Sequence, residues 1–255
     1  MNKNNEPEDK KGGIQAVGVA SEILSALCEH SGAMQLKEVA ETTGLSAPKV
    51  HRYLSSLIHS GLAEQDHRTG LYSLGPMATR LGLAAIGQNN VVMRASTLLK
   101  DLCIDLQTSG HLAIWGERGP VLIRNEHGGP PIISTMGLGA TMPLLRSATG
   151  RVYLSHLSRN ATKKLLQPEM KILKVKMEEV DAIIERTRKR GYGRIFEGLI
   201  PGLFAVSFPL FGIDGNIQCC ITIISTDREF FAENGEPISL VQHRVQNLNK
   251  INMAT

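Results

Sequence analysis

The chain has 255 residues, of which 42% are hydrophobic and 20% charged, and its formal net charge at pH 7 is +4. This length predicts two domains, and the hydrophobic fraction is sufficient for a sizeable core. The sequence has no apolar run of membrane-spanning length, and the start MNKNNEPEDKKGG does not resemble a secretory signal, so we expect a cytoplasmic protein with no membrane partner.

The mild positive charge is compatible with a nucleic-acid partner, but it is not concentrated near the start of the chain. Residues 1–90 contain eight Lys and Arg against nine Asp and Glu. DNA contacts in this part must therefore depend on where individual basic residues stand. Residues 1–13 are polar and highly charged, and we expect them to form a disordered tail.

Two short helices and a turn follow the tail. An apolar stripe from Ala16 to about His30 predicts the first helix. In the second, Leu36, Val39 and Ala40 recur at helical spacing. Gly44 then suits the left-handed residue that commonly ends a helix, so the chain is expected to turn there.

The third predicted helix has two distinct faces. Ser46 is expected to cap it through the side-chain hydroxyl, and Gly61 is expected to end it. The apolar face comprises Val50, Tyr53, Leu54 and Leu57. At about 100° per residue, the opposite face presents Pro48, His51, Arg52 and Ser55, with Lys49 at its edge.

Residues 62–74 have two short strand-like arms around a turn at Arg68-Thr69-Gly70, which predicts a β-hairpin. Two helices joined by a glycine turn and followed by a hairpin form a winged helix-turn-helix, which places one helix in the DNA major groove. The candidate DNA-binding residues are Ser46, Ala47, Pro48, Lys49, His51, Arg52, Ser55 and Arg68. The alternatives are a helix pair that serves only as core, a packing or capping role for His51, and a solvated charge at Arg52.

The remaining sequence predicts a mixed domain. Residues 76–90 are interpreted as a linker helix. Further helices are predicted at 91–108, 143–157, 161–167, 174–190 and 237–252, and strands at 111–116, 121–126, 192–196, 203–210 and 217–226. Asp214-Gly215-Asn216 is a hairpin turn. Such a mixture indicates an α+β domain.

Neither the cysteines nor the histidines form a recognisable catalytic or metal-binding pattern. Cys28, Cys103, Cys219 and Cys220 have no CxxC spacing, so we expect small buried hydrophobic residues in a reducing compartment rather than a redox sensor. No HExxH or G-x-S-x-G motif occurs, and we predict no catalytic residue, metal or cofactor. Two alternatives remain: an enzyme tethered to DNA, and an architectural DNA-binding protein without a ligand.

The single tryptophan and one basic run also need an interpretation. Trp115 lies on a predicted strand, where a core or subunit-interface position is favoured over a ligand contact. The basic residues Arg186, Arg188, Lys189 and Arg190 stand at the end of a predicted helix. Cations are favoured there by the helix dipole, so this run is interpreted as a solvated helix end.

Four segments of the sequence are specific in combination: GLSAPKVHRYLSSLIHSGL, LYSLG, PLLRSATGRVYL and RKRGYG. Through these segments the chain, from about residue 14 onward, resembles the IclR family of bacterial transcriptional regulators. It implies a winged-helix domain over 14–75, a linker helix over 76–90, and a GAF-like domain with an antiparallel sheet over 91–255 that binds an effector and oligomerises. The implied partners are double-stranded operator DNA, a small-molecule effector, and further copies of the chain in a dimer or tetramer, controlling a catabolic operon.

The resemblance also assigns an effector pocket to Ala148, Thr149, Ile195, Ala205, Thr222 and Ile224. Ile195, Ala205 and Ile224 replace polar residues of small-acid-sensing members, and Leu145 and Arg151 also depart from the family pattern. A small oxoacid would be desolvated there with few partners, so we expect an aromatic or otherwise apolar-bodied acid. Thr149 and Thr222 are the expected polar anchors, and the first N–H groups of the helix at Ala148 could assist. The alternative is that these residues are plain core around a closed pocket.

Overall fold

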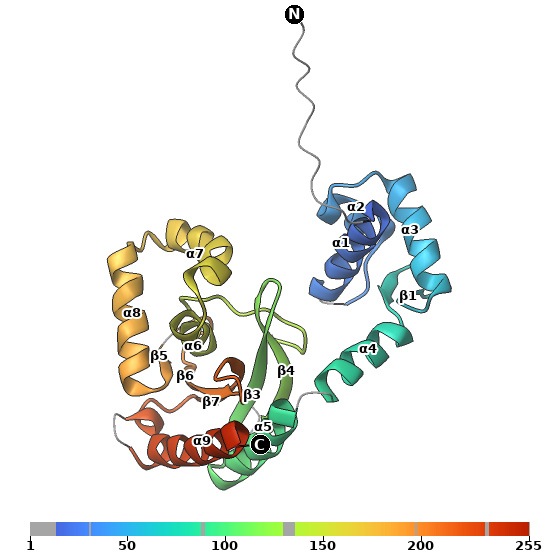
Figure 1. The fold of residues 1–255 in the computed structure, drawn as a ribbon. Helices are drawn as coiled ribbons and strands as arrows, with labels where there is room; N and C mark the ends of the chain where they lie inside the picture. Colours follow the sequence, from blue (N-terminus) through green and yellow to red (C-terminus); the bar gives the residue numbers. More distant parts are fainter. Residues whose placement is uncertain are drawn as a thin grey trace, which may run out of the picture. The chain divides into compact units, whose positions relative to one another are not determined.

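The structure is a computed structural model that describes residues 14–30, 32–87, 90–129, 136–196, 198–232 and 235–254 (Figure 1). The chain divides into two compact units, Met1–Ala85 and Ile86–Thr255. The expected tail at 1–13 lies outside the described residues. Each unit has its own hydrophobic core, and the fold class is α+β as predicted.

The first unit is a three-helix module with a small hairpin. Its elements are α1 (Gln15–Glu29), α2 (Leu36–Thr43), α3 (Ala47–His59), β1 (Ala63–Gln65) and β2 (Tyr72–Leu74). The core is built from Val19, Ile23, Leu27, Met34, Val39, Val50, Leu54, Leu57, Ala63 and Tyr72. Burying each large aliphatic side chain contributes about 1.5–3 kcal/mol, so the predicted apolar stripes hold this module together.

Local geometry confirms most of the predicted helix ends. Gly44 caps α2 with φ 68°, in the left-handed region where glycine has no side-chain penalty. The expectation for Ser46 was wrong in one respect: it is the N-cap of α3, but its hydroxyl makes no capping hydrogen bond within this described helix. Helix α3 runs to His59 with Ser60 as its C-cap, and Gly61 follows in the left-handed region with φ 71°. The Gly61 N–H donates to the Ile58 carbonyl oxygen and the Leu62 N–H to that of Leu57, each over 2.9 Å, so Gly61 ends the helix as predicted.

Helix α4 (Pro76–Gly87) contains the division between the two units. The second unit then has helices α5 (Asn90–Asp105), α6 (Ala148–His156), α7 (Arg159–Leu173), α8 (Met177–Arg190) and α9 (Glu236–Ala254), with a short 3-10 helix η1 at Glu229–Phe231. Its strands are β3 (Ser109–Gly116), β4 (Gly119–His127), β5 (Gly193–Phe196), β6 (Phe204–Phe211) and β7 (Ile217–Ser225).

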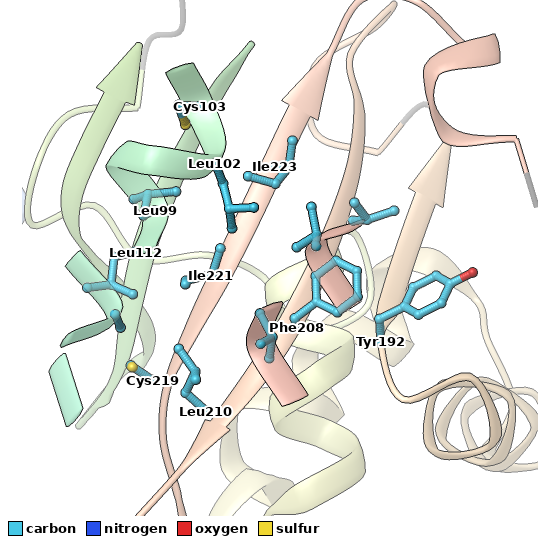
Figure 2. Packing of buried hydrophobic residues seen from close by; sticks show 14 of the residues in the cluster. Leu99, Leu102, Cys103, Leu112, Tyr192, Phe208, Leu210, Cys219, Ile221 and Ile223 are labelled. Atoms are coloured by element: carbon cyan, nitrogen blue, oxygen red, sulfur yellow. The ribbon is translucent and has the colours of Figure 1, made fainter. Parts of the chain in front are cut away.

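The five strands form one antiparallel sheet in the order β4-β3-β7-β6-β5. Helices α5 and α9 contact each other and pack on one face of this sheet. Figure 2 shows Leu99 and Leu102 of α5 against Leu112, Phe208, Ile221 and Ile223 of the strands. Alternation along β7 directs Cys219, Ile221 and Ile223 to this face.

The opposite face of the sheet receives α6. Cys220 packs with Val152 and Tyr153, and the Tyr153 hydroxyl donates to the carbonyl oxygen of Ala113 over 3.0 Å. Trp115 lies against Tyr153 with ring centroids 5.3 Å apart, which agrees with its predicted core position. The same alternation turns Thr222 and Ile224 toward this second face, where the candidate pocket lies.

Several expectations needed correction. Helix α7 continues past Pro168 to Leu173, beyond the predicted 161–167, because the Glu169 carboxylate accepts the Leu144 and Leu145 N–H groups over 2.6 and 2.8 Å. That tertiary contact offsets the hydrogen bond that proline removes. The helix predicted from 174 begins at Met177. Three cysteines are buried as expected, but Cys28 is exposed.

Candidate DNA-binding surface and effector pocket

The predicted outward face of α3 lies at the surface. Val50, Leu54 and Leu57 are buried under this helix, with exposed fractions of 0%, 0% and 5%. Ser46, Ala47, Pro48, His51, Arg52 and Ser55 are exposed, and Lys49 is half-buried at the edge. Helix α3 contains no Asp or Glu, so the face offers only neutral and basic groups.

Arg68, the eighth candidate, is exposed in the turn of the hairpin. The turn is fixed by Asp66, whose carboxylate accepts the N–H groups of Arg68 and Thr69 over 2.8 and 3.3 Å. These backbone hydrogen bonds hold the pKa of Asp66 below its usual value. A charged carboxylate thus orders the loop that presents Arg68.

A helix face with such groups suits duplex DNA. An arginine fork can donate to the major-groove edge of guanine, and lysine or serine can donate to phosphate. Ser55 is partly engaged, because its hydroxyl donates to the His51 carbonyl oxygen over 2.9 Å. Lys49 and Arg52 are the two cations of this face, and their side chains make no hydrogen bond within the described residues, so they are the stronger donors.

All six residues predicted for the effector line one cavity of about 150 Å³ in the second unit. Thr149 and Ala148 come from the start of α6, Ile195 from β5, and Ala205 from β6. Thr222 and Ile224 come from β7. The alternative of a closed pocket therefore does not describe this region.

A chain of buried hydrogen bonds crosses the floor of the cavity. His111 Nε2 lies 3.2 Å from Thr149 Oγ1, and Thr149 Oγ1 lies 2.8 Å from Thr222 Oγ1. Thr222 in turn donates to Ser207 Oγ over 2.8 Å. Sheet register explains the alignment, because Thr222 pairs with His111 on β3 and with Ser207 on β6.

The donor and the acceptor in each of these hydrogen bonds follow from counting protons. Each hydroxyl has one proton to donate. If Thr222 gives its proton to Ser207, Thr149 must donate to Thr222 and accept from His111 Nε2–H. His111 is buried, and burial lowers its pKa to about 4, so the ring is neutral at pH 7 and in this scheme carries its one proton on Nε2.

This arrangement bears on the two threonines that were expected as polar anchors. In the scheme above, the Thr149 proton is already donated to Thr222. The Thr149 and Thr222 oxygens can therefore offer acceptor capacity, while donors for an anionic ligand must come from elsewhere.

Such donors lie around the same cavity and were missed from the sequence. They include His127, Asn125 and Arg146. Arg146 is exposed, and its Nη2 donates to the Gly198 carbonyl oxygen over 2.9 Å. Cross-strand register was the available signal, since Asn125 pairs with His111. The cavity therefore has polar groups besides the two threonines predicted from the sequence.

The apolar walls are extensive. Besides Ile195, Ala205 and Ile224, the cavity is lined by Leu122, Met136, Met142, Leu199, Ile200 and Leu203. Helix α6 begins at the cavity, and the first N–H groups of a helix have no partner within it. The site therefore combines an apolar interior with a positive helix end and one arginine.

The described residues contain neither a metal centre nor a reactive buried thiol. No group of three His, Cys, Asp or Glu within them is arranged to hold a metal ion. Burial raises the pKa of the Cys103 thiol to about 12 and raises the pKa of Cys220 well above its ordinary value, so these thiols are poor nucleophiles at neutral pH. Within the same residues, no helix is long and apolar enough to cross a membrane.

A winged helix-turn-helix joined to a sheet domain with a ligand-sized cavity defines the class of ligand-responsive DNA-binding proteins. Comparison with known families agrees. Residues 16–67 match the IclR helix-turn-helix domain, and residues 83–248 match the bacterial transcriptional regulator IclR C-terminal domain. The chain belongs to the IclR family of transcriptional regulators, which bind DNA and carry a GAF-like effector domain, and it is not an enzyme.

Relatives cover most of the chain. It is 27% identical to the HTH-type transcriptional regulator BhcR of Paracoccus denitrificans, over 84% of this chain and 78% of that protein. It is 25% identical to the glycerol operon regulatory protein of Streptomyces coelicolor, over 77% and 79%. The crystal structure of Pseudomonas aeruginosa HmgR is 32% identical, with a TM-score of 0.74 over 94% of this chain and 99% of that one.

Proposed function

We propose that this protein controls a catabolic operon by binding its operator through α3 and the wing, and that a small apolar-bodied acid in the cavity changes that binding. The observation that carries the proposal is the cavity itself, which brings all six predicted effector residues together. Relatives named for the glycerol and acetate operons support the type of target. The protein then acts in the cytoplasm, where operator DNA is found.

The proposed DNA contacts are the eight residues predicted from the sequence, with Arg52 and Lys49 foremost. Exposure of Arg52 and the absence of acidic residues from α3 support this role. Fluorescence anisotropy with operator DNA tests it, because loss of a base-reading arginine weakens specific binding more than non-specific binding.

The proposed effector has an apolar or aromatic body and one anionic group. The isoleucine and leucine side chains around the cavity would cover the body, and Arg146, together with the helix end at Ala148, would receive the anion. Calorimetry with a panel of aromatic acids, alongside pyruvate and glyoxylate, tests this. Tight binding of the two small oxoacids alone would contradict the proposed class.

We further propose that two copies pair through α4, which would act as the linker helix. Leu81 and Leu83 on this helix are 53% and 65% exposed, and Met77 is 37% exposed. Apolar side chains gathered on one helix favour a protein partner. Light scattering on the wild type and on a Leu81→Lys, Leu83→Lys variant tests the proposal, because the variant should shift toward monomer.

A further inference from the structure

A second cavity in the same unit, of about 130 Å³, has an unusual lining. Four arginines from three elements converge on it: Arg151 of α6, Arg186 and Arg190 of α8, and Arg194 of β5. It shares no lining residue with the effector cavity among the described residues. The basic run at the end of α8 was interpreted as a solvated helix end, but that interpretation does not account for Arg151 and Arg194.

The described lining contains no Asp or Glu, and Arg151, Arg186 and Arg194 form no ion pair within the described residues. Arg151 donates to two carbonyl oxygens, from Nε to Leu145 over 3.0 Å and from Nη1 to Arg194 over 2.8 Å. Arg186 Nε donates to the Ala182 carbonyl oxygen over 3.1 Å. These backbone acceptors hold the guanidinium groups in place without neutralising them.

Arg194 is the least satisfied member of the group. Its guanidinium carbon lies 4.0 Å from the centre of the Phe196 ring, and its Nη1 is buried with no hydrogen-bond partner in the structure. An unpaired donor of a charged group is costly to bury. Burial, and after it the nearby charge of Arg186, lower the pKa of Arg151. A bound anion would relieve the repulsion between these guanidinium groups.

We propose that this cavity is a binding site for a phosphate group, either free inorganic phosphate or the terminal group of a small phosphorylated metabolite. Guanidinium forks match the oxygen spacing of phosphate and bind it through paired hydrogen bonds. Thr187 and Tyr192 complete the lining with hydroxyl groups.

The site is also placed to influence the effector cavity. Along α6, Thr149 lines the effector cavity and Arg151 lines the basic one. Along β5, Arg194 and Ile195 point to opposite sides and line one cavity each. Phosphate that fixes Arg151 and Arg194 would therefore stiffen two elements of the effector cavity.

Calorimetry and thermal unfolding of the full chain test the site. Inorganic phosphate and glycerol 3-phosphate are titrated separately, with sodium chloride at matched ionic strength as reference. We expect one or both to bind and raise Tm beyond chloride, and the tighter of the two identifies the source of the phosphate group. Arg186→Gln should weaken binding about tenfold, and the Arg186→Gln, Arg194→Gln variant should abolish it.

The control is Lys189→Gln, which removes the same charge from an exposed position of α8 outside the cavity and should bind within about twofold of wild type. Arg186 is itself exposed, so its variant should fold normally. Equal stabilisation by chloride, or equal weakening in Lys189→Gln, would overturn the proposal. Unchanged binding in the Arg186→Gln, Arg194→Gln variant would overturn it as well.

Discussion

Replacing Thr222 by valine tests the buried hydrogen-bond chain beneath the effector cavity. The change keeps the shape of the side chain but removes the hydroxyl that joins Thr149 to Ser207. Two hydrogen bonds worth about 0.5–1.5 kcal/mol each are lost, and the Thr149 proton is left in a buried site without its acceptor. We expect the free energy of unfolding to fall by about 2–4 kcal/mol.

Thr222→Ser is the matched control, because it keeps the hydroxyl and removes only a buried methyl group, at a cost of about 0.5–1.5 kcal/mol. Urea unfolding followed by the fluorescence of Trp115, the single tryptophan, reports on the second unit. The Thr149→Val, Thr222→Val variant should lose less than the sum of the single changes, since both act on one bond. If Thr222→Val were no less stable than Thr222→Ser, the hydrogen bonds from Thr222 to Thr149 and Ser207 would not stabilise the fold at the cavity floor.

Three further predictions concern DNA, pH and operator symmetry. Arg52→Ala should weaken operator binding by roughly 1–3 kcal/mol with unchanged unfolding, and wild-type affinity in a gel-shift titration would remove Arg52 from the interface. Buried His111 stays neutral down to about pH 4, whereas it takes up a proton near pH 6.5 when unfolded. The free energy of unfolding should therefore fall by about 1.4 kcal/mol per pH unit as the pH drops from 6.5 to 4. A His111→Gln variant should show a smaller slope of this free energy against pH, and equal slopes for wild type and variant would contradict the prediction. The operator should be an inverted repeat with half-sites near one helical turn, about 10 base pairs, and footprinting of a single half-site bound by monomer would contradict that.

The DNA-binding unit was the part most fully predictable from the sequence. The buried stripe at Val50, Leu54 and Leu57 follows from helical periodicity, and the turn at Gly44 follows from local backbone preference. Such signals are local, so they can be recognised without knowing the rest of the fold. The capping hydrogen bond predicted for the Ser46 hydroxyl was wrong, because a residue type that often caps helices does not by itself fix the side-chain rotamer.

The effector cavity was predictable in its walls but not in its polar groups. Family resemblance identified six lining residues, whereas Asn125 and His127 lie on β4, and only the pairing of β4 with β3 brings them to the cavity. The alignment of His111, Thr222 and Ser207 depends on register across three strands. Extension of α7 past Pro168 likewise depends on a tertiary contact, through Glu169.

The central claim, that a ligand in the cavity of the second unit changes operator binding by the first, is tested most directly with Ala205→Phe. Ala205 is half-buried on the cavity wall, and a phenyl ring there would fill the cavity. Operator affinity is measured by fluorescence anisotropy while an aromatic acid that binds the wild type is titrated in, with the exposed Ala161→Phe as control. Wild type and control should change their operator affinity in response to the acid, whereas Ala205→Phe should bind the operator normally and not respond. A wild-type response at the same acid concentrations in Ala205→Phe would contradict the claim.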